Sequence, residues 1–136
     1  MSGASPYQRY VETQVNTLTP AGLVVAAYDA AIRFAETALR KMEVHKLDEQ
    51  SANIIKAQHI LLELLASLDP IYDPKLAAGL DGLYRYMFDR LTHANVRDDR
   101  AALEEVIRLL KELRAAWAEA AASLKTKTAE TGERAA

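Results

Sequence analysis

The chain has 136 residues, the length of one ordinary domain, and half of them are hydrophobic, which is enough for a sizeable core. Its 17 basic and 19 acidic residues are interspersed and give a net charge of −2, so there is no basic stripe to bind nucleic acid. The absence of cysteine excludes disulfides, thiolate metal sites and cysteine nucleophiles. The longest fully apolar run, residues 23–28, is far short of the roughly 20 residues that cross a bilayer. Since no secretory signal is recognisable either, we expect a cytoplasmic protein that does not insert into membranes.

The first 18 residues are mostly polar, and the first helix is predicted to begin at Thr19 and Pro20. Threonine caps a helix well, and proline suits the first helical position, where its missing N–H needs no partner. The helix is expected to run to about Met42. Its apolar residues form two stripes, one of Leu23, Ala27, Ala30, Phe34 and Ala38, and one of Val24, Tyr28, Ile32, Ala35, Leu39 and Met42. A surface helix normally has one such stripe, so the second needs an explanation.

Three more helices are predicted from apolar residues that recur at three- and four-residue spacing. They cover about residues 48–67, about 74–94, and from Asp98 or Asp99 to about Leu124. The expected N-caps of the first two are Asp48 and Asp73, and Asn95 suits a left-handed end of the helix over 74–94.

Short connections make successive helices antiparallel neighbours, which predicts an all-α fold, an antiparallel up-down four-helix bundle. The bundle is expected over residues 19–124, with the segment 1–18 partly ordered and packing on it. Residues 125–136 have nothing to bury and are expected to form a disordered tail. Gly79 and Gly82 each cost roughly 1 kcal/mol relative to alanine inside a helix, and we expect another backbone to come close to them.

Groups for catalysis or cofactor binding are not arranged in any known motif. A di-metal bundle needs Glu-x-x-His pairs, and none of the three histidines has a glutamate three residues before it. His59 is the candidate for histidine phosphotransfer, but isoleucine and leucines follow it instead of the lysine and glycine typical of such domains. No glycine-rich phosphate loop or serine elbow is present. We therefore predict a protein that is not an enzyme and needs no cofactor or metal.

What the chain has in surplus is hydrophobic surface. The second stripe of the first helix either lies in a wide bundle interior or lines a groove for a partner helix, and periodicity leaves both interpretations open. In the second interpretation, apolar residues before Thr19 could cover the groove until a partner displaces them. Alternatively, Leu18 packs on the first helix as a hydrophobic staple. A further alternative is a plain oligomerising bundle whose extra apolar face is a dimer interface.

Four segments of the chain carry a combination of motifs: "YQRYVETQVNTLTPAGLVVAAYDAAIRF" (7–34), "IIKAQHILLELLASLD" (54–69), "LDGLYRYMFDRLTHAN" (80–95) and "LEEVIRLLKELRAAW" (103–117). Together they resemble the FliS family of flagellin-export chaperones. The Tyr-Asp pair before Ala-Ile, the Leu-Tyr-x-Tyr-Met run and the Leu-Arg-x-x-Trp run occur in the family's order and cover nearly the whole chain except the tail.

The resemblance implies an antiparallel bundle that binds the disordered C-terminal segment of flagellin in the cytosol. It also implies that the protein prevents premature polymerisation of flagellin and helps deliver it to a component of the flagellar type III export gate. By the same resemblance, the N-terminal segment takes part in flagellin binding, and the apolar surface around the first helix receives flagellin helices.

The candidate flagellin-binding residues are large apolar or aromatic side chains beside the main stripes or in the N-terminal segment. They are Tyr7, Tyr10, Val11, Tyr28, Ile32, Leu62 and Tyr84. Two other functions remain as alternatives, a phosphotransfer-like bundle that uses His59 and a plain oligomerising bundle. The free protein is expected to be a monomer or a weak homodimer.

Overall fold

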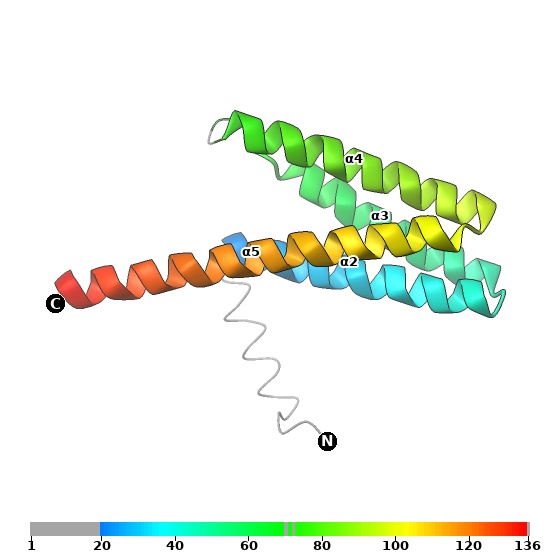
Figure 1. The fold of residues 1–136 in the computed structure, drawn as a ribbon, viewed down its shortest axis with the longest axis horizontal. Coiled ribbons are helices and arrows are strands. Elements are labelled where there is room, and N and C mark those ends of the chain that lie inside the picture. The colour runs from blue at the N-terminus through cyan, green and yellow to red at the C-terminus, as the bar shows by residue number, and fades with distance from the viewer. Residues whose placement is uncertain (1–19, 70, 72, 136) are drawn as a thin grey trace, which may run out of the picture.

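The structure is a computed structural model that describes residues 20–69, 71 and 73–135, with side chains up to Ser123. Four helices account for most of these residues: α2 (Pro20–Glu43), α3 (Leu47–Ala66), α4 (Pro74–Arg97) and α5 (Arg100–Ala135). The predicted all-α fold with four helices is confirmed (Figure 1). The N-terminal segment expected to pack on the bundle lies outside the described residues.

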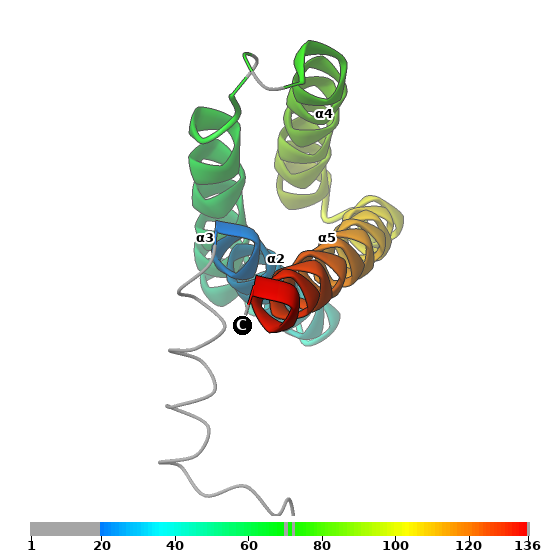
Figure 2. The ribbon, with the colours of Figure 1, turned by 90° about the vertical axis from the view of Figure 1, so that its left-hand side faces the viewer.

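The helices are arranged in a ring in which each one packs on the helices before and after it. α2 contacts α3 and α5, and α4 contacts the same two helices from the opposite corner (Figures 1 and 2). Successive helices run antiparallel, as the short connections predict. α2 packs more extensively on α3 and α5 than α4 does on the same two helices, so more of its surface is covered and less of it needs to be polar.

The core takes most of the second stripe predicted on α2, together with Ala31 and with Ala38 of the first stripe, whereas Val24 and Leu39 are partly buried. Its fully or nearly fully buried residues on this helix are Tyr28, Ala31, Ile32, Ala35, Ala38 and Met42. The three alanines let α3 and α5 approach closely, because a methyl group fills little space between helix axes. Of the other stripe, Phe34 is partly buried against the core, whereas Leu23 at the start of α2 is 56% exposed. A wide bundle interior thus accounts for most of the apolar side chains of α2 that exceed a single stripe.

The helix ends follow local hydrogen bonding, with two departures from expectation. Asp73 caps α4 as predicted, its side chain accepting from the backbone N–H of Leu76 at 3.1 Å. Asp99 likewise accepts from the N–H of Ala102 at 3.2 Å at the start of α5. The prediction of Asp48 as a cap is wrong, because α3 already begins at Leu47.

The prediction that Asn95 ends α4 is also wrong. The left-handed residue is Asp98, with φ of 51°. Asn95 lies inside the helix, where its side-chain oxygen accepts from Ser51 Oγ at 2.9 Å and from Gln50 Nε2 at 3.3 Å. The helix therefore continues for three residues past its expected end, which allows Asn95 to bond to α3.

One expectation about packing also differs. A Cβ atom added at Gly79 or Gly82 would meet nothing within 4 Å, so the expected close approach of another backbone is wrong. α5 runs to Ala135 through the segment for which the sequence predicts disorder, and it projects beyond the other helices (Figure 1). The side chains beyond Ser123 are not among those described, so the expected disorder of the tail stays a prediction.

Candidate partner-binding surface

Three of the predicted flagellin-binding residues lie in the core. Tyr28 and Tyr84 are 0% and 2% exposed, and Ile32 is 9% exposed. The two tyrosines meet across the bundle from α2 and α4, with their hydroxyl oxygens 2.6 Å apart and their ring centroids 6.4 Å apart. The premise that these side chains lie outside the core does not hold in the bundle, whose interior is wide enough to enclose them, and their role in flagellin binding stays a prediction.

The buried tyrosine pair fixes α2 to α4. Burial, reinforced by the hydrogen bond and charge of Tyr84, raises the pKa of the Tyr28 hydroxyl well above its ordinary value, and the Trp117 side chain on α5 lowers it by less. Burial also raises the pKa of Tyr84, against the hydrogen bond from Tyr28. Both groups are thus neutral at physiological pH, and removing either hydroxyl deprives the other of its 2.6 Å hydrogen bond.

Leu62 is the predicted binding residue that the structure places on the surface. It is 47% exposed on α3, and Ile55, two turns earlier on the same face, is 45% exposed. The exposed His59 lies between them, one turn from each. We name Ile55, His59 and Leu62 the α3 patch. Ile55 was not among the predicted binding residues, although its seven-residue spacing from Leu62 was the signal that could have found it.

A shallow groove of about 630 Å3 lies between α2 and α5 on the outside of the bundle. Its apolar lining comes from Leu39, Ile107 and Ala115, and its charged lining from Glu36, Arg40, Glu43, Glu104, Arg108, Lys111 and Glu112. Two ion pairs join the two helices here, Lys111 to Glu36 at 3.2 Å and Arg100 to Glu43 at 3.0 Å. Sequence periodicity could not find this groove, since it depends on which helix packs beside α2.

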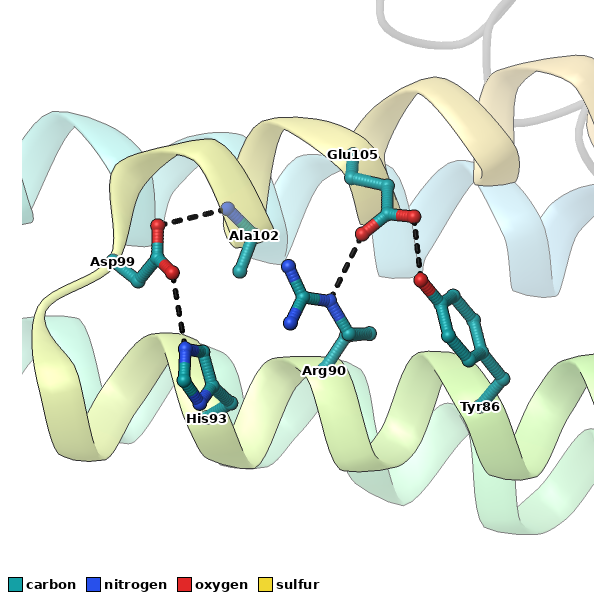
Figure 3. Close-up of polar contacts among 6 residues, drawn as sticks. All are labelled: Tyr86, Arg90, His93, Asp99, Ala102 and Glu105. Atoms are coloured by element: carbon teal, nitrogen blue, oxygen red, sulfur yellow. Dashed lines mark hydrogen bonds and ion pairs between the residues drawn. The ribbon is translucent and has the colours of Figure 1, made fainter.

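A polar cluster fastens the second half of α4 to the start of α5 (Figure 3). The Glu105 carboxylate accepts from the Tyr86 hydroxyl at 2.6 Å and from Arg90 Nε at 2.9 Å. These partners, the tyrosine hydrogen bond first, lower the pKa of Glu105. One turn along, His93 Nε2 lies 3.0 Å from Asp99 Oδ2. Since these side chains are paired with one another, the cluster holds two helices together.

Tyr7, Tyr10 and Val11, the remaining predicted binding residues, lie outside the described residues. Within the described part of the chain, no three histidine, aspartate or glutamate side chains are grouped so that they could hold a metal ion. No helix there combines the length and apolarity needed to cross a membrane.

The fold and its surfaces define a helical bundle with apolar side chains exposed on the outer faces of its helices. The family model described as flagellar protein FliS matches residues 3–124, and the chain belongs to the FliS family. It is 33% identical to the flagellar secretion chaperone FliS of Bacillus subtilis (strain 168) over 120 residues, which are 88% of this chain and 89% of the relative. It is 34% identical over 118 residues to the protein of the same name from Salmonella typhimurium (strain LT2), covering 85% and 87% of the two chains. It is also 33% identical over 118 residues to flagellar secretion chaperone FliSB of Pseudomonas aeruginosa (strain PAO1), covering 86% and 94%.

Proposed function

We propose that this chain is a flagellar secretion chaperone that binds the disordered C-terminal segment of flagellin in the cytosol. Bound there, it prevents premature polymerisation and assists delivery to the flagellar type III export apparatus through a component of the export gate. The match of the FliS model to residues 3–124 carries the proposal, because it spans the whole bundle and not a single motif. The protein acts by binding, without catalysis.

Exposed apolar side chains on a rigid helix suit this task. The α3 patch places Ile55 and Leu62 two turns apart, the spacing at which an amphipathic partner helix presents its own apolar side chains. α3 is held in place under the patch, because Gln58 Nε2 donates to Thr92 Oγ1 at 2.8 Å and to the Phe88 carbonyl at 3.1 Å. The patch is therefore presented without much rearrangement of the bundle.

Reversible binding follows from the state of the partner. A disordered segment loses conformational entropy when it is ordered on the chaperone, so affinity stays modest for the surface that is covered. This suits a partner that must be released at the export gate. The N-terminal segment, including Tyr7, Tyr10 and Val11, is proposed to contribute either as a contact or as a cover over the apolar surface.

The proposal is tested by titration calorimetry with a peptide of flagellin's C-terminal segment. Covering the exposed half of Ile55 or Leu62 contributes roughly 1 kcal/mol each, half of what full burial of such a side chain contributes. We expect I55A/L62A to raise Kd about 25-fold with unchanged unfolding midpoint. The control is Val96→Ala, which shortens a side chain 72% exposed at the far end of α4 and leaves Kd unchanged. Failure of the full chain to bind the peptide at all would refute the proposed function.

The same titration with a chain lacking residues 1–18 separates the two roles of the N-terminal segment. Tighter binding after truncation identifies a cover, and weaker binding identifies a contact. The plain oligomerising bundle is tested by light scattering during gel filtration at several concentrations. A stable dimer whose affinity falls in the I55A/L62A variant would favour that alternative.

A further inference from the structure

The polar contacts of α4 with the rest of the bundle are confined to one half of the helix. Among the described residues, every hydrogen bond or ion pair that joins α4 to another helix involves Tyr84 or a residue after it. The hydrogen bonds and ion pairs of residues 74–83 stay within the helix or its cap. Examples are the bond from the Leu76 N–H to Asp73 and the ion pair of Asp81 with Arg85. α4 is thus fastened from its middle to its C-terminal end.

The apolar packing shows the same division. In the second half, Tyr84, Met87, Leu91 and Ala94 are all 2% exposed or less. In the first half, Leu80 belongs to the buried core cluster, Ala77 is 9% exposed and Leu83 is partly buried against the core, whereas Leu76 is 51% exposed. α4 and α5 meet at the corner between them and diverge toward the start of α4 in both views (Figures 1 and 2). The first half therefore buries its apolar side chains less completely than the second half and has no polar contact with another helix among the described residues.

The two helix glycines lie in this weakly attached half. Gly79 and Gly82 have open space around them, so close packing does not explain them. Glycine gains more backbone entropy on leaving a helix than any other residue, which lowers the cost of opening. Residues 74–83 thus combine weak attachment to the bundle with a backbone in which glycine lowers the stability of the helix.

We propose that residues 74–83 form a flap that opens from the bundle while residues 84–97 stay fastened, and that the open flap admits a partner helix to the apolar surface beneath Leu80 and Leu83. The opening is a property of the free chain. The admission step rests on the proposed function, since its partner is the flagellin segment. Segments with few buried contacts open locally at much lower free energy than the whole protein unfolds.

Hydrogen exchange of the free, full-length chain tests the flap without any partner. We expect the amides of Leu80 and Asp81 to exchange at least tenfold faster than those of Leu91 and Thr92. The amides of residues 53–54 lie as far from the start of α3 as Leu80 and Asp81 lie from the start of α4. Their exchange serves as the reference for ordinary fraying of a helix start. Equal protection along α4 would overturn the flap.

A double substitution makes the test specific. Gly79→Ala with Gly82→Ala is expected to slow exchange at Leu80 about fivefold per substitution, because each alanine favours the helix by that factor. Exchange at residues 91–92 should not change. Ala116→Gly, at an exposed position of α5, is the matched control and should leave exchange at Leu80 unchanged. No effect of the double substitution at Leu80 would show that glycine does not govern the opening.

Stopped-flow mixing with the flagellin C-terminal peptide tests admission. If the open flap is the binding-competent form, the double alanine variant associates up to about 25-fold more slowly, in proportion to the lost open population. An unchanged association rate would overturn admission through the flap. Fast exchange at Leu80 together with no peptide binding in the wild type would refute the proposed function while confirming the flap.

Discussion

The hydroxyl pair of Tyr28 and Tyr84 makes a quantitative prediction about stability. Tyr84→Phe keeps the ring but leaves the Tyr28 hydroxyl, 0% exposed, without the partner that lies 2.6 Å away. A buried polar group that loses its partner costs about 1–3 kcal/mol, whereas replacing both partners with apolar groups of the same shape is nearly neutral. We expect each single phenylalanine variant to lose stability in this range and the double variant to lose much less than the sum.

The same pair predicts a dependence on alkaline pH. Because the pKa of each tyrosine is raised in the folded state, the folded chain keeps both protons above pH 10 while the unfolded chain releases them. The contribution of the pair is thus fully present below about pH 10 and falls above it, by at most about 1.4 kcal/mol per pH unit for each tyrosine, until the raised pKa of that tyrosine is reached. The double phenylalanine variant lacks this part of the decline.

Urea unfolding followed by circular dichroism measures both effects. Free energies at neutral pH give the double-mutant cycle, and a series from pH 9 to pH 11 compares the wild type with the double variant. The fluorescence of Trp117, the single tryptophan, gives a second probe of the same transition. Additive losses in the cycle, or the same alkaline decline in both proteins, would refute the coupling of the two hydroxyls.

Three further substitutions test separate parts of the structure. Asp73→Ala removes the cap of α4 and should cost about 1 kcal/mol by urea unfolding, whereas Asp73→Asn should retain most of it; equal losses would refute capping. Glu105→Gln weakens the contacts to Tyr86 and Arg90. These contacts lower the pKa of Glu105, so they stabilise the wild type above the ordinary carboxyl pKa, and this stabilisation is lost as pH falls through the lowered pKa. The variant should therefore lose less stability in acid than the wild type does, as measured by urea unfolding. His59→Ala should change the Kd for the flagellin peptide by less than the 25-fold of the double α3 patch variant, and loss of all function with binding intact would instead favour phosphotransfer.

The fold was predictable because helix periodicity and capping are local properties. The caps at Asp73 and Asp99 and the four helices follow from residues that lie within one or two turns of one another. The position of Asn95 was not predictable from local signals, since the partners that keep it inside α4 are Gln50 and Ser51 on another helix. Local rules identify where a helix can end, and tertiary contacts decide between the options.

The candidate site was harder to predict than the fold, because exposure depends on how wide the interior is. The choice of Tyr28 and Tyr84 as groups outside the core fails because each is covered by a neighbour that periodicity alone does not place. Leu62 lies far enough around α3 from the core to remain on the surface. The groove between α2 and α5 required knowledge of which helices are neighbours.

The ring arrangement of the helices has a consequence for synthesis of the chain. Within the described part of the chain, three of the four helix interfaces join consecutive helices, and the one between α2 and α5 joins the first of these helices to the last. Short-range interfaces of this kind form in microseconds to milliseconds, whereas α2 cannot complete its packing until the ribosome has released α5. Its core stripe therefore stays partly uncovered throughout translation, and the ion pairs from Asp29, Glu36 and Glu43 to α5 are among the last contacts to form.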